Sequence, residues 1–340
     1  MSPGAAPAFW WRPAGWPARL LAPAAYLYGR VAGHRLGRGA RAGVGVPVLC
    51  VGNFTAGGAG KTPTALALAG FAQRAGRRPG FLSRGHGGSA AAALLIDPAR
   101  HDAGLTGDEP QLLAGEAPTV VSRDRVAGAR LLAGHGCDFI VMDDGFQSAR
   151  LRADLSLLVV DGRRGLGNGR VLPAGPLRAP LAIQLAHADA VLVIGEGEAG
   201  DAASRIAAEA GVPVHRGRVS PVDAGALVGP PLFAFAGLAD PGKFYRSLAE
   251  IGADVRDSRD FPDHHSFTPE EIAELTAVAE GNGYLLATTA KDAARLAASE
   301  EGRALLAQGL VLDVALTLDA GIGESLIART LEAFETRSQP

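Results

Sequence analysis

The chain has 340 residues, of which 47% are hydrophobic and 20% are charged, and its formal net charge is −2. This composition excludes a disordered chain and is typical of a globular protein with one large or two ordinary domains. The small net charge predicts no nucleic-acid partner. The two cysteines, Cys50 and Cys137, lack the spacing of a zinc site, so we expect buried thiols and no structural zinc.

The first quarter of the chain is strongly basic. No Asp or Glu precedes Asp97, whereas basic residues recur from Arg12 onward. Residues 9–41 contain all three tryptophans, but prolines and arginines interrupt the segment and leave no run of about 20 apolar residues to span a bilayer. The segment also lacks the features of a signal peptide. We expect residues 1–42 to contain an amphipathic helix in an anionic membrane interface, the alternative being a helix packed on the protein's own core.

Apolar runs alternate with helical patterns over residues 43–215. Strands are expected at residues 46–53, 80–83, 119–122, 139–143, 155–161 and 190–194, and helices at residues 62–75, 108–114, 123–133 and 202–210. Strands that are apolar throughout indicate a parallel sheet covered by helices on both faces. The pattern therefore predicts an α/β domain over residues 43–215.

A second alternation begins after connections rich in Pro and Gly near residues 213–231. Strands are expected at residues 232–238, 284–290 and 310–318, and helices at residues 240–252 and 268–281. Thr268, Pro269 and Glu271 form the pattern of a capping box with Pro at the first helical position. We predict a smaller α/β domain over residues 216–340, with a final helix near residues 323–336 that packs on either domain.

A glycine-rich loop lies between the first strand and the first helix of residues 43–215. Its sequence, "VGNFTAGGAGKTP", matches the P-loop pattern G-x-x-x-x-G-K-[ST] except that Thr55 stands at the first Gly position. Glycines free backbone amides to surround a phosphate, Lys61 would reach the β- and γ-phosphates of ATP, and Thr62 would bind Mg²⁺. The predicted nucleotide-binding residues are Thr55, Gly57, Gly58, Ala59, Gly60, Lys61 and Thr62. The alternative is a glycine-rich turn without a ligand.

Lysine is rare in this chain. Lys61, Lys243 and Lys291 are its only lysines, and its other basic residues are arginines. The ammonium of lysine is a compact charge, whereas the guanidinium of arginine is planar, so the two are not interchangeable at a specific site. A lysine in a chain that otherwise uses arginine therefore supports a specific role for Lys61.

Three further segments carry candidate catalytic side chains. "CDFIVMDDGFQ" reads as a buried strand that ends in Asp143 and Asp144, where P-loop enzymes hold Mg²⁺; the alternative is a turn-forming Asp-Asp-Gly. "LTGDEPQLLAG" contains Asp108, which could also simply complement a helix dipole. "DFPDHHSF" places His264 and His265 in a loop, where they are suited to proton transfer.

Taken in order, the motifs resemble those of the tetraacyldisaccharide 4′-kinase family of the lipid A pathway. They are "VGNFTAGGAGKTP", "LSRGHGG", "TGDEP", "DDGFQ", "GNGRVLPAGPLR", "FAGLADPGKFYRSL", "FPDHHSFT" and "TAKDAARL", and they span nearly the whole chain. Thr at the position of Thr55 is part of the family pattern. His86 and Ala179 depart from it, since the family has Tyr and Glu there.

The resemblance implies an ATP- and Mg²⁺-dependent kinase that phosphorylates the 4′-hydroxyl of a tetraacyldisaccharide 1-phosphate to give lipid IVA. It implies a peripheral or monotopic protein at the cytoplasmic face of the bacterial inner membrane, with no obligate protein partner. Asp108 matches the proposed base and His264 its partner, while His265 falls where the family varies. The candidate substrate residues are Arg84, Arg125, Gln147, Asn168 and Arg178, and closure of the two domains would assemble the site.

Two other functions fit parts of this pattern. The first is a membrane-associated P-loop NTPase switch or metallochaperone-like GTPase, for which "TTAKD" is a weak match to a base-reading N-K-x-D because Ala290 stands in place of Asn. The second is a membrane-surface binding module whose P-loop is only structural. The second function leaves Asp108, Asp143 and Asp144 without an explanation.

Overall fold

The structure of the protein is a computed structural model that describes residues 6–39, 41–148 and 150–338. Residues 1–5 and 40 of the predicted N-terminal segment lie outside the described residues, as do residues 149 and 339–340 of the two predicted domains.

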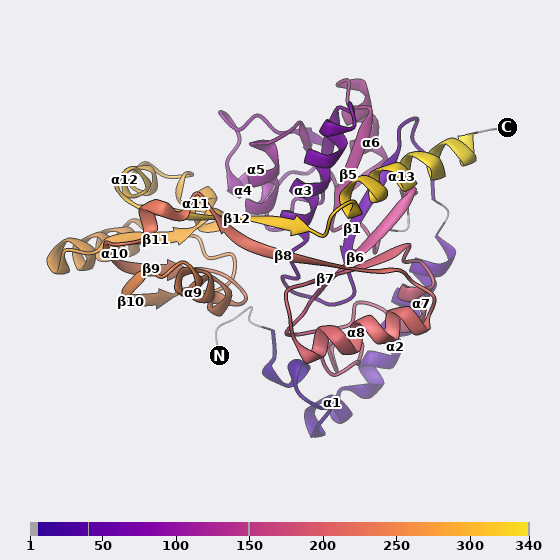
Figure 1. Ribbon diagram of the computed structural model, residues 1–340, viewed down its shortest axis with the longest axis horizontal. Coiled ribbons are helices and arrows are strands. Elements are labelled where there is room, and N and C mark those ends of the chain that lie inside the picture. The colour runs from indigo at the N-terminus through magenta and orange to yellow at the C-terminus, as the bar shows by residue number, and fades with distance from the viewer. Residues whose placement is uncertain (1–5, 40, 149, 339–340) are drawn as a thin grey trace.

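Over the described residues, the chain forms one 12-stranded sheet (Figure 1). The strand order is β10-β9-β11-β12-β8-β7-β6-β1-β5-β2-β4-β3. Most neighbours are parallel, whereas β12 pairs antiparallel with β8 and β3 pairs antiparallel with β4. The strands are β1 (Val48–Asn53), β2 (Pro79–Ser83), β3 (Leu94–Leu95), β4 (Thr119–Val121), β5 (Phe139–Asp143), β6 (Leu155–Asp161), β7 (Ala190–Ile194), β8 (Val214–Val222), β9 (Pro231–Ala236), β10 (Asp254–Asp260), β11 (Leu285–Thr289) and β12 (Leu310–Leu318).

Helices connect most of these strands. They are η1 (Ala8–Trp11), α1 (Trp16–Leu20), α2 (Ala22–Arg38), α3 (Lys61–Arg74), α4 (Ala103–Thr106), α5 (Asp108–Ala114), α6 (Arg125–Gly134), α7 (Leu181–Leu185), α8 (Glu198–Glu209), η2 (Ala224–Leu227), α9 (Pro241–Glu250), α10 (Pro269–Asn282), α11 (Ala290–Leu296), α12 (Glu300–Gln308) and α13 (Ile322–Ser338).

The larger lobe, built on β1 to β8, has a hydrophobic core on each face of the sheet. Leu49 and Val51 of β1 pack in one core with α3, α5 and α13, and Val48 and Cys50 pack in the other with α2, α6, α7 and α8. Successive strand side chains point to opposite faces, so an apolar strand fills both cores. The predicted α/β fold with a parallel sheet is therefore confirmed. The final helix, α13, packs against α3, β1 and β6.

The smaller lobe contains β9 to β11 and α9 to α12, and it has hydrophobic clusters of its own. The antiparallel strands β8 and β12 run between the two lobes (Figure 1). Strand β12 contributes to both, since Leu312 lies in a cluster of the smaller lobe and Leu316 in a core of the larger one. The predicted boundary between residues 215 and 216 falls inside β8.

Three observed strands, β3, β8 and β10, lie outside the predicted ones. β3 has two residues, and β8 lies in the stretch near residues 213–231 for which connections rich in Pro and Gly are predicted. β10 has the sequence "DVRDSRD", is largely exposed, and forms the edge of the sheet. An exposed edge strand buries little surface, so it needs no apolar alternation by which a sequence could reveal it.

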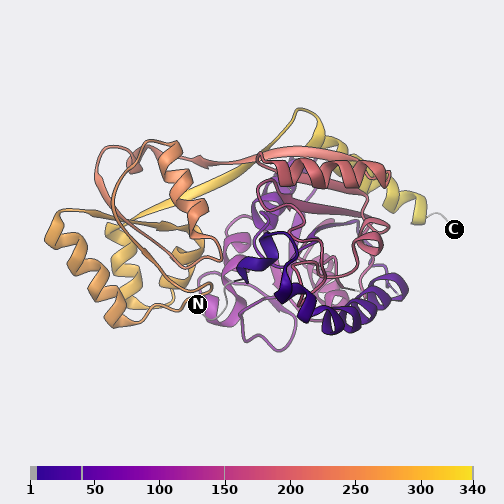
Figure 2. The ribbon, with the colours of Figure 1, turned by 90° about the horizontal axis from the view of Figure 1, so that it is seen from below.

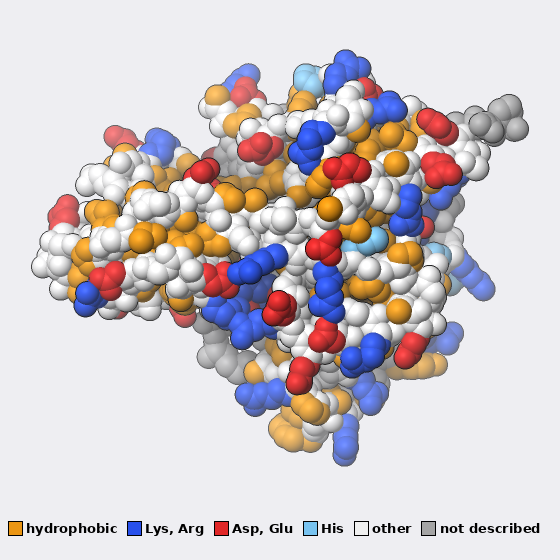
Figure 3. Space-filling model, viewed as in Figure 1, with side chains coloured by type: hydrophobic (Ala, Val, Ile, Leu, Met, Phe, Trp, Pro, Cys, Tyr) orange, Lys and Arg blue, Asp and Glu red, His pale blue; other side chains and the backbone are white. Residues whose placement is uncertain are grey.

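The N-terminal helices lie along the outside of the larger lobe (Figure 2). Helix α2 contacts α7 through a face of small residues, where a Cβ on Gly33 would come within 2.7 Å of Ile183 Cδ1. Helix α1 and the outward side of α2 expose large apolar side chains, and Figure 3 shows hydrophobic side chains beside basic ones at this end of the molecule. The exposed apolar side chains are Trp16 and Leu20 of α1 and Tyr26, Leu27, Tyr28 and Val31 of α2. Among the helices within the described residues, none has the length and apolar character needed to cross a bilayer.

Candidate active site

The loop between β1 and α3 has the conformation of an anion-binding turn. Gly57 and Gly60 have φ angles of 114° and 95°, which strain any residue that carries a side chain. The amide of Asn53 donates a hydrogen bond to the carbonyl of Gly57 at 3.1 Å and closes the turn. Lys61 begins α3 and is buried, and the helix N-terminus adds partial positive charge at the same place. The loop is thus preformed to receive a phosphate.

Thr55, the variant residue of the motif, pairs with a neighbouring loop. It forms an isolated antiparallel bridge with Leu177, and its carbonyl accepts a hydrogen bond from Nε of Arg178 at 3.1 Å. The next residue, Ala56, donates to the carbonyl of Pro176 at 2.8 Å. Because Thr55 has no positive φ, its position does not require glycine.

Asp143 has the features of a metal ligand. It ends β5 and is fully buried, and its Oδ2 lies 3.5 Å from the hydroxyl of Thr62. Its Oδ1 is buried without a hydrogen-bond partner. Burial, followed by the negative charge of Glu109, raises the pKa of Asp143 to about 7. A divalent cation would satisfy this oxygen and favour the ionised form, so Thr62 and Asp143 fit Mg²⁺.

Mg²⁺ at this place would need ligands beyond the protein. No group of three or more His, Cys, Asp or Glu side chains that could hold a metal ion occurs among the described residues. This agrees with the usual coordination of Mg²⁺ in enzymes that bind nucleotides, where one or two protein oxygens are joined by phosphate oxygens and water.

Asp144 is engaged by basic side chains. Its two carboxylate oxygens accept hydrogen bonds from Nη1 and Nη2 of Arg178 at 2.8 and 3.2 Å, and Lys61 Nζ lies 3.9 Å away. Burial alone would raise the pKa of Asp144, but Lys61 and Arg178 outweigh it and lower the value. Of the two adjacent carboxylates, Asp143 therefore carries the unpaired oxygen and Asp144 fixes two cations beside the loop.

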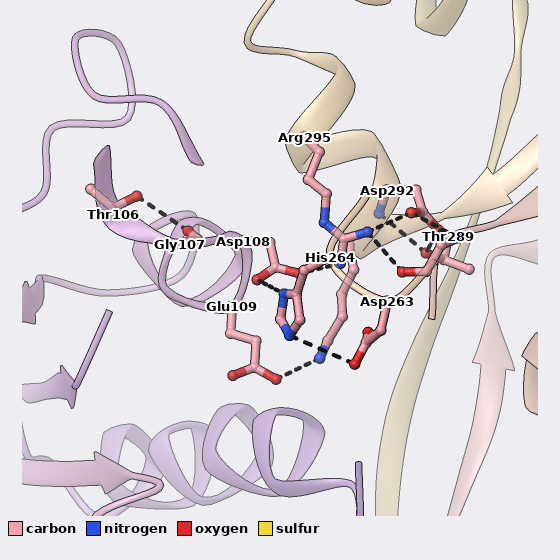
Figure 4. Close-up of polar contacts among 11 residues, drawn as sticks. Thr106, Gly107, Asp108, Glu109, Asp263, His264, Thr289, Asp292 and Arg295 are labelled. Carbon is pink, nitrogen blue, oxygen red and sulfur yellow. Dashed lines mark hydrogen bonds and ion pairs between the residues drawn. The ribbon is translucent and has the colours of Figure 1, made fainter. Parts of the chain in front are cut away.

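Asp108 lies at the junction of the two lobes (Figure 4). It begins α5, and its carboxylate accepts a hydrogen bond from Nη2 of Arg295 at 2.5 Å and lies 3.3 Å from Nδ1 of His264. Burial tends to raise the pKa of Asp108, but the hydrogen bond with His264 and the charges of Arg295 and Lys291 hold it well below its ordinary value. The hydrogen bond with Asp108 in turn raises the pKa of His264 against the effect of burial.

The two adjacent histidines face different surroundings. His264 has a φ of 57° and points to Asp108, with Asp263 Oδ2 3.9 Å from its other ring nitrogen. His265 Nε2 lies 2.7 Å from Oε2 of Glu271, which also accepts a hydrogen bond from the backbone amide of Thr268 in the capping box of α10. His265 thus supports a helix terminus within the smaller lobe.

A family model described as Tetraacyldisaccharide-1-P 4'-kinase matches residues 17–332. The chain belongs to this kinase family.

Similar proteins agree with the family. A tetraacyldisaccharide 4'-kinase of Sinorhizobium fredii is 51% identical over 335 residues, which cover 98% of this chain and 96% of the relative. A protein of the same name from Brucella ovis is 49% identical, with 98% of each chain covered. The crystal structure of an "apo" form of LpxK from Aquifex aeolicus in complex with ATP has a TM-score of 0.72 and 28% identity, over 92% of this chain and 99% of that one.

These relationships confirm the predicted family and identify the protein as a kinase, a phosphotransferase with an alcohol acceptor. They favour the predicted ATP dependence, because the LpxK structure holds ATP. They give no support to the GTPase switch, the metallochaperone or the non-catalytic binding module.

The candidate substrate residues of the kinase have different environments. Arg84 follows β2 and is exposed, whereas Arg125 is buried and donates to the carbonyls of Ser122 and Asp144 at 3.1 and 3.3 Å. Gln147 donates to the carbonyl of Asn53 and accepts from Arg178, which places both beside the P-loop. The amide of Asn168 donates to the carbonyls of Ala174 and Phe9 and accepts from the backbone of Arg170. Arg125 and Asn168 therefore hold backbone segments in place, and their contact with substrate stays a prediction.

Sequence reasoning missed several polar residues of the kinase site. Lys291 Nζ lies 2.5 Å from Oε1 of Glu109, and Arg295 binds Asp108. Lys243 donates to the carbonyl of Gly58 at 3.0 Å and pairs with Asp161. The rarity of lysine in the sequence could have indicated Lys243 and Lys291. All three lysines lie in or contact the P-loop or contact the residues around Asp108.

Proposed function

We propose that the protein uses ATP and Mg²⁺ to phosphorylate the 4′-hydroxyl of a tetraacyldisaccharide 1-phosphate, giving lipid IVA in lipid A biosynthesis. One observation carries the proposal. In a member of the tetraacyldisaccharide-1-P 4'-kinase family, a preformed P-loop lies beside the unpaired oxygen of Asp143, and the Asp108–His264 pair lies at the junction of the lobes.

The P-loop residues bind and orient the triphosphate. Backbone amides of the loop and the ammonium of Lys61 stabilise the negative charge that develops on the transferred group. Thr62 and Asp143 would hold the metal ion, which would supply positive charge against the phosphates. Asp144 keeps Lys61 and Arg178 directed at the same place through its ion pairs.

Asp108 and His264 act as a unit on the proton of the sugar hydroxyl. The carboxylate of Asp108 is ionised at neutral pH and accepts the hydroxyl hydrogen bond, which orients the oxygen for attack on phosphorus. The hydrogen bond with Asp108 raises the pKa of His264, and the His264 ring holds the Asp108 carboxylate in place. A weakly basic carboxylate suffices, because phosphoryl transfer depends more on positioning and charge than on early proton removal.

The N-terminal helices hold the kinase at the anionic face of the bacterial inner membrane. Support comes from the exposed apolar side chains of α1 and α2 and from the basic residues of a segment that contains no acid. A peripheral position of this kind would bring the lipid substrate to a kinase that draws ATP from water.

The test is transfer of labelled phosphate from γ-labelled ATP to the acylated disaccharide in detergent micelles. We expect labelled lipid only when Mg²⁺ is present, and a loss of about 10²- to 10⁴-fold in kcat for Asp108→Asn. The control is Arg303→Gln, because Arg303 is exposed on α12 and its side chain donates to the backbone carbonyl of Ala297, outside the candidate site. ATP hydrolysis without labelled lipid, or an Asp108→Asn variant with near wild-type transfer, would contradict the proposal.

A further inference from the structure

Arg295 of α11 connects Asp108 to the buried interior of the smaller lobe. Its Nη2 donates to Asp108 Oδ2 at 2.5 Å, and its Nη1 donates at 2.8 Å to both Asp292 Oδ1 and the carbonyl of Gly237 (Figure 4). The side chains of Arg295, Asp108 and Asp292 are 8%, 2% and 0% exposed. A buried guanidinium whose donors are shared by two carboxylates is held in one orientation.

Asp292 is the fixed end of this chain of contacts. Its carboxylate accepts hydrogen bonds from the backbone amide of Gly237 at 3.1 and 3.2 Å and from the hydroxyl of Thr289 at 2.7 Å. These partners belong to β11 and to the turn after β9, inside the smaller lobe. Contacts within the smaller lobe therefore fix the orientation of the Arg295 guanidinium, independently of Asp108 in the larger lobe.

We propose that Arg295 is a positioning residue, which is anchored on Asp292 and keeps the Asp108 carboxylate ionised and in one orientation during transfer. This inference rests on the proposed role of Asp108 in accepting the proton of the sugar hydroxyl. Arg295 acts on the substrate only through Asp108.

Several other groups face this carboxylate, so the effect of Arg295 has to be separated from theirs. They are His86, Glu109, Asp263, His264, Lys291 and Asp292. Arg295 lowers the pKa of Asp108 and also opposes the raised pKa of His264. Loss of its charge therefore moves both pKa values upward, and transfer should then require a higher pH.

The experiment compares pH profiles of kcat and kcat/KM in the full-length enzyme. For Arg295→Gln we expect kcat at neutral pH to fall about 10- to 10²-fold, because the carboxylate loses its fixed orientation. The acid side of the profile should move up by about one pH unit or more. Arg295→Lys keeps the charge but not the planar fork, so it should restore the position of the acid limb while kcat stays below wild type.

A variant that leaves buried Asp292 unpaired can fail to fold, so the double variant Arg295→Gln/Asp292→Asn removes both charges together. It should fold, as measured by thermal unfolding, and still show the shifted acid limb. Arg303→Gln is the matched control and should keep the wild-type profile.

The outcomes separate the two proposals. If Arg295→Gln lowers stability but the acid limb of its pH profile stays at the wild-type pH, Arg295 is only structural and the inference fails. If Asp108→Asn keeps wild-type transfer, the role of Asp108 fails first, whatever the Arg295 variants do. Both proposals are supported if three results are found together. Asp108→Asn is inactive, the acid limb of Arg295→Gln moves to higher pH, and the acid limb of Arg295→Lys returns to the wild-type position.

Discussion

The side chains of Asp108 and His264 alter each other's affinity for a proton. Their hydrogen bond lowers the pKa of the carboxyl and raises that of the imidazole. A group whose pKa is raised by folding contributes stability that is fully present below its unfolded pKa, about 6.5 for histidine. That contribution is lost as the pH rises through the higher pKa of the folded protein.

We therefore expect His264→Ala to lower the temperature of thermal unfolding more at about pH 6 than at about pH 9. The same variant should lower kcat by about 10²-fold, because Asp108 loses its partner. His265→Ala is the comparison. It should lower kcat much less, since the ring of His265 contacts the capping box and aromatic rings of the smaller lobe and not Asp108 within the described part of the chain. Equal losses of kcat in the two variants would contradict the pairing of Asp108 with His264.

At the scale of single elements, α2 has two unlike faces. Gly29 and Gly33 let it approach Pro180 and Ile183 of the larger lobe, whereas its large apolar side chains are exposed. The alternative reading of the N-terminal segment thus holds for the face that packs on the protein, whereas contact of the exposed side with a membrane stays a prediction.

We expect the double variant Leu20→Asp/Leu27→Asp to bind anionic lipid vesicles at least about tenfold more weakly in a sedimentation assay. The reason is that burial of each leucine contributes about 1.5–3 kcal/mol. Val278→Asp on α10 is the control, since Val278 is exposed on the smaller lobe. Vesicle binding that survives the double variant would place the membrane contact elsewhere.

The elements also show what the sequence could predict. The glycine-rich loop lies between a strand and a helix as predicted, and a strand ends in Asp143 as predicted, because each motif is continuous in the chain. The contacts of Asp108 with Arg295 and of Glu109 with Lys291 join residues 187 and 182 positions apart, and only the tertiary fold brings them together. β10 escaped prediction because its charged side chains carry no strand periodicity.

On the scale of the whole molecule, polar contacts link the two lobes around the site. Glu109 pairs with Lys291, Asp108 binds His264 and Arg295, and Lys243 reaches the carbonyl of Gly58. The strands β8 and β12 also connect the lobes. His264 and Arg295 of the smaller lobe therefore meet Asp108 of the larger lobe only when the two lobes are held together.

We expect the cross-lobe pair to appear as coupling in a double-mutant cycle on kcat/KM. Glu109→Gln and Lys291→Met should each impair transfer, and the double variant should lose about as much as either one, a coupling of about 1–2 kcal/mol. Arg216 and Asp201 form a surface pair within the larger lobe, so their cycle should give less than about 1 kcal/mol. Additive losses for Glu109 and Lys291 would show that the lobes contribute independently.

The scarcity of lysine gives the molecule built-in spectroscopic reporters. Every side-chain ammonium in the sequence, at positions 61, 243 and 291, lies within contact distance of the P-loop or of its opposing carboxylates. Growth on isotope-enriched lysine would therefore yield a spectrum in which each of the three ammonium resonances reports on the P-loop or on the residues that face it. Titrating nucleotide or lipid into such a sample would follow the binding of each in turn.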